Sequence, residues 1–482
     1  MRHRVGAVLA PSVFLLLLAL PLEGLSTPAH RLAAVLSAVV ILWVTEALPL
    51  PVTALLGASV CVVLGVAPAK QVFAPFADPL MFLFIGAFIL ARAIFLHKLD
   101  RRLAYAVLSL PWVGARPSRI LLAFGAVTAF ISWWISNTAT TAMMFGIGLS
   151  ILAALRAPGA GPTIDPRYAT GLMLMTSFAA SIGGLATPVG TPPNLIGLGF
   201  IRSLVGVEIS FLRWMMIGVP AVVVLFIFLY LYLNAVAPAG VGKLPAGAQL
   251  IREERARLGS WTRGQRSVAL AFGVTIVLWI VPGIVALVAG ERSAAYLALN
   301  RNMPEGVAAL LGAMLLFVLP GDGRSAITWD EAVQIDWGVV LLYGGGFALG
   351  VLSFDTGLAE AMGRALTGLL PIHGSFGMLV AAVLVAVILS ETTSNTAAAN
   401  MVVPVVISIS RAAGLDPLEP ALGATMAASL GFMLPVSTPC NAIVYGSGLI
   451  PLGRMIRYGL ALDLAGIVVI VTLVRLLSPL IR

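Results

Sequence analysis

The chain has 482 residues, of which 60% are hydrophobic and 10% are charged, and its mean hydropathy is +1.04. Because an ordinary soluble domain carries roughly 25% charged residues, this composition excludes a soluble globular protein. The formal net charge of +9 is typical of many nucleic-acid-binding proteins. Here, however, the basic residues cluster in a few loops, as the orientation rule for membrane proteins requires. The sequence therefore predicts a multi-pass protein of the cytoplasmic membrane, in contact with lipid and binding no nucleic acid.

Apolar stretches long enough to cross a bilayer, about 20 residues each, recur along the whole chain. The first follows a basic start and resembles a signal peptide. No small-residue cleavage site follows it, so we expect a retained first span. Simple spans are predicted, in chain order, at residues 6–22, 32–49, 51–67, 79–96, 214–236, 267–289, 303–320, 337–354 and 458–479.

Four longer apolar segments are interrupted. Residues 118–155 and 376–411 each consist of two apolar arms around a polar turn. Each segment can form two full crossings or one re-entrant hairpin, and hydropathy does not decide between them. Residues 170–200 and 420–447 carry glycine and proline inside the apolar run, which predicts broken helices.

The distribution of basic residues predicts the orientation of the chain. With a cytoplasmic N-terminus, most of the 29 Lys and Arg residues fall in cytoplasmic loops, and the C-terminus is external. Five simple crossings separate the span that contains Gly86 from the span that contains Gly345. Because this number is odd, we expect the second half of the chain to be inverted relative to the first.

Two polar motifs occur once in each half. Residues 136–139 read Ser-Asn-Thr-Ala, and residues 394–397 repeat them 258 positions later. Residues 188–194 read Pro-Val-Gly-Thr-Pro-Pro-Asn, and residues 435–441 match them at five of seven positions. Small polar residues with glycine and proline, repeated inside apolar segments, are typical of a transporter whose binding site lies between two repeats built from broken helices.

The residue types in these motifs suit ions of both signs. Hydroxyl and amide oxygens, together with carbonyls freed at a helix break, are ligands of hard cations. The N-terminal ends of half-helices offer free N–H groups to an oxyanion such as a carboxylate. A single Ser-Asn-Thr in a membrane helix is most often a helix–helix contact, but two inverted copies favour a binding site. No basic residue lies inside either motif, so co-bound sodium ions would supply the positive charge.

At these residues the sequence resembles the divalent anion/sodium symporter family, which carries di- and tricarboxylates or sulfate. The similarity covers nearly the whole chain and is strongest in residues 43–53, 390–397 and 431–445. It implies an all-α polytopic membrane protein with two inverted-topology repeats, about 11 transmembrane helices and two re-entrant helical hairpins. It also implies a homodimer and an elevator-type motion of a transport domain against a fixed scaffold.

The resemblance, with the long polar connection in mid-chain, suggests how the chain is divided. The run from Arg252 to Arg257 in that connection predicts a short amphipathic helix at the cytoplasmic surface. The expected parts are the scaffold (1–115) and transport (116–236) parts of the first repeat, a cytoplasmic linker (237–266), and the scaffold (267–375) and transport (376–482) parts of the second.

The resemblance also implies the binding residues. A small dianion is expected to contact Asn137, Thr138, Thr191, Pro192, Asn395, Thr396, Thr438 and Pro439. The first sodium site would consist of Ser132, Ser136, Asn137 and Gly190, and the second of Ser390, Thr393, Asn395 and Ser437. Because each asparagine would then serve both ion and substrate, the two would bind cooperatively.

We therefore expect a secondary transporter that couples dicarboxylates of the succinate, malate and fumarate class to sodium. A sodium-independent exchanger of dicarboxylates or citrate would retain the same motifs, and sulfate is an alternative substrate. An enzyme is not expected, because the sequence has no nucleophile elbow, buried histidine cluster or paired aspartates. Glu391 lies beside the second motif, where it could carry a proton, tune the sodium site or serve as a structural hydrogen-bond acceptor.

Overall fold

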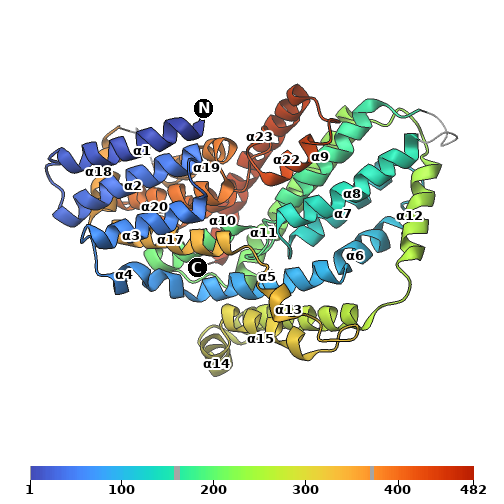
Figure 1. Ribbon diagram of the computed structural model, residues 1–482, viewed down its shortest axis with the longest axis horizontal. Helices are drawn as coiled ribbons and strands as arrows, with labels where there is room; N and C mark the ends of the chain where they lie inside the picture. The colour runs from blue at the N-terminus through green and yellow to red at the C-terminus, as the bar shows by residue number, and fades with distance from the viewer. Residues whose placement is uncertain (1, 157–162, 370–373, 482) are drawn as a thin grey trace.

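The computed structural model describes residues 2–156, 163–369 and 374–481, and throughout these ranges the regular elements are helices (Figure 1). The first half contains α1 (Arg2–Ala19), α2 (Thr27–Thr45), α3 (Leu50–Val63), α4 (Ala69–Phe73), η1 (Ala74–Ala77), α5 (Pro79–Leu96), α6 (Leu99–Leu108), α7 (Pro117–Ser132), α8 (Asn137–Arg156), α9 (Pro166–Gly183), α10 (Pro192–Phe200), η2 (Ile201–Val205) and α11 (Phe211–Val236).

Helix α12 (Pro245–Arg257) lies in the polar connection between the halves. The second half contains α13 (Arg263–Ala289), α14 (Ala294–Asn302), α15 (Glu305–Val318), α16 (Trp329–Ala332), α17 (Trp337–Asp355), α18 (Leu358–Leu369), α19 (Gly374–Thr392), α20 (Asn395–Ala412), α21 (Leu418–Ala427), α22 (Pro439–Tyr445), α23 (Leu452–Leu477) and η3 (Ser478–Leu480). Residues 370–373, which precede the expected boundary at 375, lie outside the described ranges, as do the two terminal residues.

Each predicted simple span contains one helix. Most of these helices are long enough to cross a membrane, but some helices of the chain are shorter. Among the described residues, nine helices are long and apolar enough to cross a membrane, and the bent pair α14–α15, with an angle of 60°, raises the number to ten. Helix α3 has 14 residues and α7 has 16, which are short for a crossing. The segments 170–200 and 420–447 are each divided into two helices: α9 with 18 residues and α10 with 9, and α21 with 10 and α22 with 7. The chain is therefore a multi-pass membrane protein with broken helices, as expected.

Where the two halves meet, a helix of each half packs against a helix of the other. Helix α5 of the first half packs against α15 of the second, and α17 of the second packs against α3 of the first. A glycine permits each close approach: a Cβ at Gly86 would lie 2.5 Å from the backbone of Ala309, and a Cβ at Gly345 would lie 2.6 Å from the Ala54 side chain. Gly86 and Gly345 are 259 positions apart, close to the 258-residue offset of the repeated Ser-Asn-Thr-Ala, so equivalent glycines have the same packing role in both halves.

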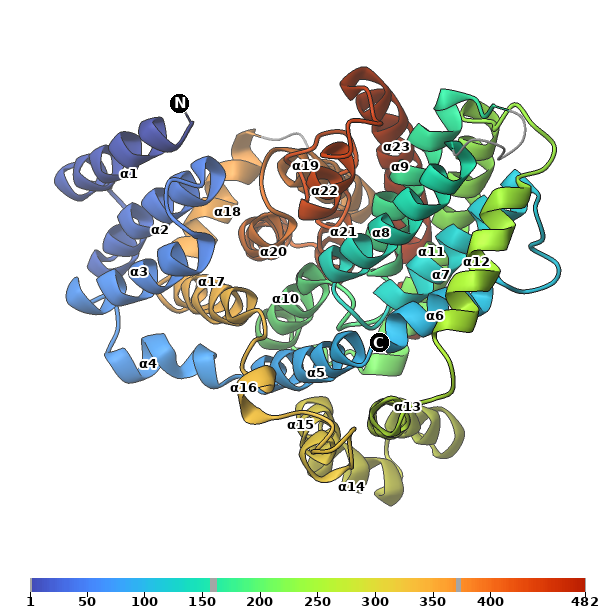
Figure 2. The same cartoon turned by 45° about the vertical axis from the view of Figure 1, so that its right-hand side comes forward.

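The hairpins α7–α8 and α19–α20 pack together with the broken helices α9–α10 and α21–α22. In Figure 2, α10, α20, α21 and α22 lie in the middle of the molecule, and α7, α8 and α9 lie on the side towards α12. Each half contributes to the other here too, because α10 packs against α20 and α22 packs against α8. The long helices α11 and α23 pack against one another, and each also contacts the hairpin and the broken helix of its own half.

The contacts of the two halves are not fully equivalent for the helices around the central group. Helix α18 packs along α20, whereas its counterpart α6 packs against α7, and α12 bridges α6 and α8. Helix α17 contacts α10 and α20, but α5 makes no comparable contact with α22 or α8 among the described residues. The hairpins and broken helices therefore pack against α17 and make few contacts with α5.

Candidate functional site

The two hairpin tips have the same internal hydrogen bond. The Ser132 hydroxyl at the end of α7 donates to Asn137 Oδ1 at the start of α8, over 2.7 Å. The Ser390 hydroxyl at the end of α19 donates to Asn395 Oδ1 at the start of α20, over 2.8 Å. Each hydroxyl closes the turn between the two arms and fixes the asparagine side chain at the tip. The repeated Ser-Asn-Thr is therefore a defined turn, in which the asparagine begins the second arm.

The breaks in the two broken helices are braced by the last asparagine of each repeated motif. Asn194 Nδ2 donates to the carbonyls of Gly184 and Thr187, at 2.9 and 2.8 Å. Asn441 Nδ2 donates to the carbonyls of the residues 247 positions further along, Gly431 and Leu434, at 2.9 and 3.0 Å. Both asparagines are fully buried. These amides satisfy carbonyls that the interrupted helix leaves without a partner.

The short helices after the breaks restart in the same way. Thr191 precedes α10 with φ −146° and ψ 142°, and Thr438 precedes α22 with φ −141° and ψ 149°. A proline follows each threonine as the first residue of the helix, where its missing N–H costs no hydrogen bond. The sequence Thr-Pro thus sets the position at which each helix restarts.

The tips and the restarts together line one cavity of about 790 Å³. All eight residues predicted to contact substrate lie on its wall: Asn137, Thr138, Thr191, Pro192, Asn395, Thr396, Thr438 and Pro439. The opposite wall consists of residues of α5, α17 and the start of α3. The structure therefore brings the two repeated motifs, which are far apart in sequence, to a common space.

The residues predicted for sodium lie on or directly behind the same wall. Ser136, Asn137, Asn395 and Ser437 line the cavity. Ser132, Ser390 and Thr393 are buried behind the tips. Gly190 lies in a tight turn, in which a Cβ would come within 2.5 Å of the Gly184 carbonyl oxygen.

The described residues contain no group of three or more His, Cys, Asp or Glu side chains that could hold a metal ion. A cation at either tip would therefore be held mainly by hydroxyl, amide and carbonyl oxygens. Such oxygens are the ligands that sodium shares with other hard cations.

Sequence reasoning missed the polar residues on the opposite wall. Arg92 near the end of α5 donates to the Gln334 side chain, and its Nε has no hydrogen-bond partner. Asp336 accepts from the Val339 N–H at 3.2 Å and so caps α17. All three polar side chains, Arg92, Gln334 and Asp336, line the cavity. No local motif marks them, because they approach the site only through the packing of α5 and α17.

The far end of α5 is closed against the central helices. Asp78 caps α5 by accepting from the Leu80 N–H at 2.9 Å, and it forms an ion pair with Arg202 of η2. The buried Tyr343 hydroxyl of α17 donates to Asp78 Oδ1 at 3.2 Å. Beside this ion pair, the rings of Phe200 and Phe347 meet edge to face at 5.4 Å. The Asp78 end of α5 is thus closed by polar and aromatic contacts, whereas Arg92 and Asp336 line the cavity.

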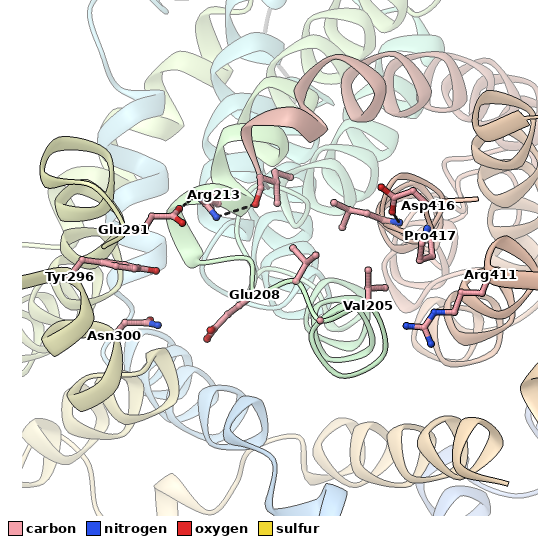
Figure 3. A pocket seen from close by; sticks show the side chains of 13 residues that line it. Val205, Glu208, Arg213, Glu291, Tyr296, Asn300, Arg411, Asp416 and Pro417 are labelled. Carbon is pink, nitrogen blue, oxygen red and sulfur yellow. Dashed lines mark hydrogen bonds and ion pairs between the residues drawn. The ribbon is translucent and has the colours of Figure 1, made fainter. Parts of the chain in front are cut away.

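A second hollow of about 770 Å³ lies between η2, the α13–α14 connection and the start of α21 (Figure 3). It contains charges of both signs, and some of them are engaged: Arg213 forms an ion pair with Glu291 and donates to the Ile481 carbonyl at 3.0 Å. Glu208 and Asp416 also line this hollow. None of the repeated polar residues lies on its wall, so the cavity at the tips is the better candidate for the binding site.

The sequence model described as "Sodium:sulfate symporter transmembrane region" matches residues 3–481. The chain belongs to this family. The resemblance predicted from the two tips and the second broken helix is thereby confirmed. The family is one of transporters, which agrees with the expectation that the protein is not an enzyme.

Curated relatives of the family cover almost the whole chain. A protein of Staphylococcus saprophyticus named sodium-dependent dicarboxylate transporter SdcS is 35% identical over 484 residues, covering 98% of this chain and 91% of the relative. A protein of Staphylococcus aureus with the same name is 34% identical over 494 residues, covering 99% and 91%.

Two solved structures resemble the fold at low sequence identity. The MtrF structure of Neisseria gonorrhoeae, described as an antimetabolite efflux pump, has a TM-score of 0.57 and 13% identity, with 97% of each chain covered. The YdaH transporter of Alcanivorax borkumensis has a TM-score of 0.52 and 14% identity, with 84% of this chain and 86% of that one covered. At these identities the likeness shows a shared transporter fold and nothing finer.

Proposed function

We propose that the protein moves C4-dicarboxylates across the cytoplasmic membrane together with sodium ions. One observation carries this proposal: both hairpin tips and both helix restarts line a single cavity, and their polar groups are neutral. Relatives with 34–35% identity over nearly the whole chain are named sodium-dependent dicarboxylate transporters. That name favours carboxylates over the sulfate in the family description.

The proposed substrate spans the space between the two halves. One carboxylate lies against Asn137 and Thr138 with the Thr191–Pro192 restart, and the other lies against the corresponding residues of the second half. A dianion of succinate length suits two such subsites, because each carboxylate can accept from amide, hydroxyl and backbone N–H donors. Specificity for a dianion then arises from the pairing of the subsites.

Sodium supplies the positive charge that the tips lack. One ion binds at Ser132, Ser136, Asn137 and Gly190, and another at Ser390, Thr393, Asn395 and Ser437. The serine-to-asparagine hydrogen bonds at 2.7 and 2.8 Å support this arrangement, since they hold each asparagine where both ligands can use it. An ion that orders the asparagine before substrate arrives lowers the cost of substrate binding, which couples the two.

The proposed transport motion is of the elevator type. The two hairpins, the two broken helices, α11 and α23 form the moving part, and α1 to α6 with α13 to α18 form the scaffold, following the division expected from the sequence. The position of Arg92 on the cavity wall and the closed end at Asp78 support an inward-facing state, because the charge bias of the loops predicts that Arg92 lies on the cytoplasmic side. The N-terminus is then cytoplasmic and the C-terminus external.

Two further expectations belong to this proposal. The halves are inverted repeats, which is supported by the exchanged contacts of α5 with α15 and of α17 with α3. The protein forms a homodimer through the scaffold, which leaves the moving part free to shift within each protomer. Cross-linking of purified protein in lipid nanodiscs tests the dimer, and a monomer only would contradict it.

The decisive test is uptake of labelled succinate into proteoliposomes. One set of vesicles has an inward sodium gradient, and the other is sodium-free and preloaded with unlabelled succinate. Accumulation that requires sodium supports the proposal, and competition by malate, fumarate, citrate and sulfate defines the substrate class. Uptake that requires preloading without sodium would make the protein an exchanger and overturn the proposed coupling.

A further inference from the structure

The middle of α23 holds a buried carboxyl group. Asp463 is 2% exposed, and among the described residues neither of its side-chain oxygens meets the geometry of a hydrogen bond, although the Phe432 backbone and the Glu391 carboxyl lie beside it. None of the ion pairs among the described residues includes it. A carboxylate buried in a membrane-spanning helix is costly without a counter-charge, and such groups usually serve ion pathways or binding sites.

A second buried carboxyl group lies beside it. Glu391, at the end of α19, is 3% exposed, and its carboxyl lies close enough to Asp463 for a hydrogen bond if one of the two carried a proton. Glu391 itself has donors: the Met433 N–H at 2.8 Å and the Ser437 hydroxyl at 2.6 Å. Two adjacent carboxylates repel one another strongly in a medium of low dielectric constant, so the pair is stable only when it holds a proton or a cation.

Two glycines of α23 allow the close helix packing that brings Asp463 near Glu391. Gly459 and Gly466 flank Asp463 on one face of the helix, four residues before it and three after it. A Cβ at Gly459 would lie 2.3 Å from the Phe432 carbonyl oxygen, and one at Gly466 would lie 2.6 Å from the Leu430 side chain. The two glycines let α23 lie directly against the unwound segment between α21 and α22. The carboxyl therefore reaches Glu391 because the helix packing permits it.

We propose that Glu391 and Asp463 bind a sodium ion at a site additional to the two at the hairpin tips. This inference rests on the proposed sodium coupling. Both carboxylates are hard oxygen ligands, and the Ser437 hydroxyl, which donates to Glu391, joins this site to the sodium site at the second tip. One ion between the carboxylates offsets one of their two negative charges, while the ion at that tip serves the substrate carboxylate. Both sites are filled in the sodium-loaded protein and are joined through Ser437.

The first half has no counterpart of this site. The residue that matches Glu391 at the 258-residue offset is Trp133. Gly218 approaches the Leu185 carbonyl oxygen within 2.4 Å of its Cβ position, as Gly459 approaches Phe432, so the match to Asp463 is Val222. A tryptophan and a valine offer no oxygen ligand from their side chains. The additional ion consequently binds in the second half only.

The test measures bound sodium directly. Equilibrium binding of ²²Na⁺ to the purified full-length protein is compared between the wild type, Asp463→Asn and the control Asp100→Asn, which alters a buried carboxyl of α6 outside the site. Asp463→Asn is expected to bind one ion fewer per chain, and the Hill coefficient for sodium activation of succinate uptake is expected to fall by about one. Asp100→Asn is expected to retain the wild-type values.

A second variant and a pH series keep the inference open to disproof. Should Asp463→Asn not fold, Glu391→Gln removes the partner ligand and is expected to lose the same ion, with sodium-dependent thermal stabilisation as a second readout. A wild-type number of bound sodium ions in both variants would overturn the site. If that number is unchanged but the pH dependence of succinate uptake is altered, the two carboxyls share a proton instead, which also overturns the site. Sodium-independent uptake by the wild type would instead overturn the proposed coupling, and this inference with it.

Discussion

In the first half, the serine at the hairpin tip is followed by Trp133 and Trp134, whereas in the second half it is followed by Glu391 and Thr392. The Trp134 ring stacks on Phe211 at 6.3 Å and meets Phe272 edge to face at 5.4 Å. The first tip is thus surrounded by aromatic side chains, and the second by carboxyl groups. The serine-to-asparagine bonds inside the two tips nevertheless differ by only 0.1 Å.

The comparison separates two kinds of residue. Those that occur in both halves, such as Asn137 and Asn395, build the shared cavity. Those that occur in one half, such as Glu391 and Asp463, lie behind the cavity wall and make the surroundings of the two tips unequal. We infer that the repeated residues determine what is bound, while the unrepeated ones determine which ions accompany it.

Substitution of Asn194 or Asn441, which hydrogen-bond the carbonyls at the helix breaks, is expected to have the largest effect, a loss of stability. Asn194→Leu and Asn441→Leu each leave two buried carbonyls without a donor, at a cost of about 1–3 kcal/mol per group. The Asn441 variant is expected to lose more stability, because Asn441 Oδ1 also accepts from the Ser177 hydroxyl at 2.5 Å, whereas Asn194 Oδ1 has no partner. Thermal unfolding in detergent measures both, and Ser177→Ala should account for the difference. Equal losses in the two variants would contradict this ranking.

Removal of the tip asparagine in either half should strongly reduce transport. Asn137→Ala and Asn395→Ala are expected to lower succinate uptake by about 10–100-fold, the range seen when a site loses supporting contacts. Ser150→Ala on the exposed part of α8 serves as the control, because its hydroxyl bonds only within its own helix, to Gly146. Transport at the wild-type rate in both asparagine variants would exclude a site shared by the two halves.

The tip serines should have unequal effects on sodium affinity. Ser132→Ala removes a donor that serves one acceptor, whereas Ser390→Ala removes a single donor shared between two acceptors, Asn395 Oδ1 and the Ala428 carbonyl at 2.9 Å, and so leaves both without it. At about 0.5–1.5 kcal/mol per bond, the sodium concentration for half-maximal uptake should rise several-fold in the first variant and further in the second. Sodium titrations of uptake measure both, and the reverse order would show that the second tip does not depend on Ser390.

The smallest effect is expected at the sealed end. Asp78 and Asp336 cap α5 and α17 at related positions, but only Asp78 has an ion pair, with Arg202. Because this pair is partly exposed, Arg202→Gln should weaken the closure by roughly 0.5–1 kcal/mol, a few-fold shift in population. A membrane-impermeant thiol reagent applied from the Asp78 side should then label Cys440 faster, with buried Cys61 as internal reference. Faster labelling in Asp336→Asn as well would show that the ion pair is not the cause.

Much of the site could be predicted before the structure. The repeated tips and restarts were recognisable because each is a contiguous motif whose backbone chemistry is local: a serine that closes a turn, a threonine and proline that restart a helix. All eight predicted substrate residues line one cavity. Their roles as ligands remain a proposal that the uptake and sodium experiments test.

The sequence by itself determined the membrane class, the family and the residues of the two tips, because composition and short motifs suffice for these. Only the tertiary structure decided which distant residues meet: Arg92 and Gln334 on the cavity wall, Asp78 with Arg202, and Glu391 with Asp463. The physical reason is that these contacts depend on how closely whole helices approach. That approach is controlled by glycines such as Gly459, whose packing partners lie elsewhere in the chain and leave no local pattern.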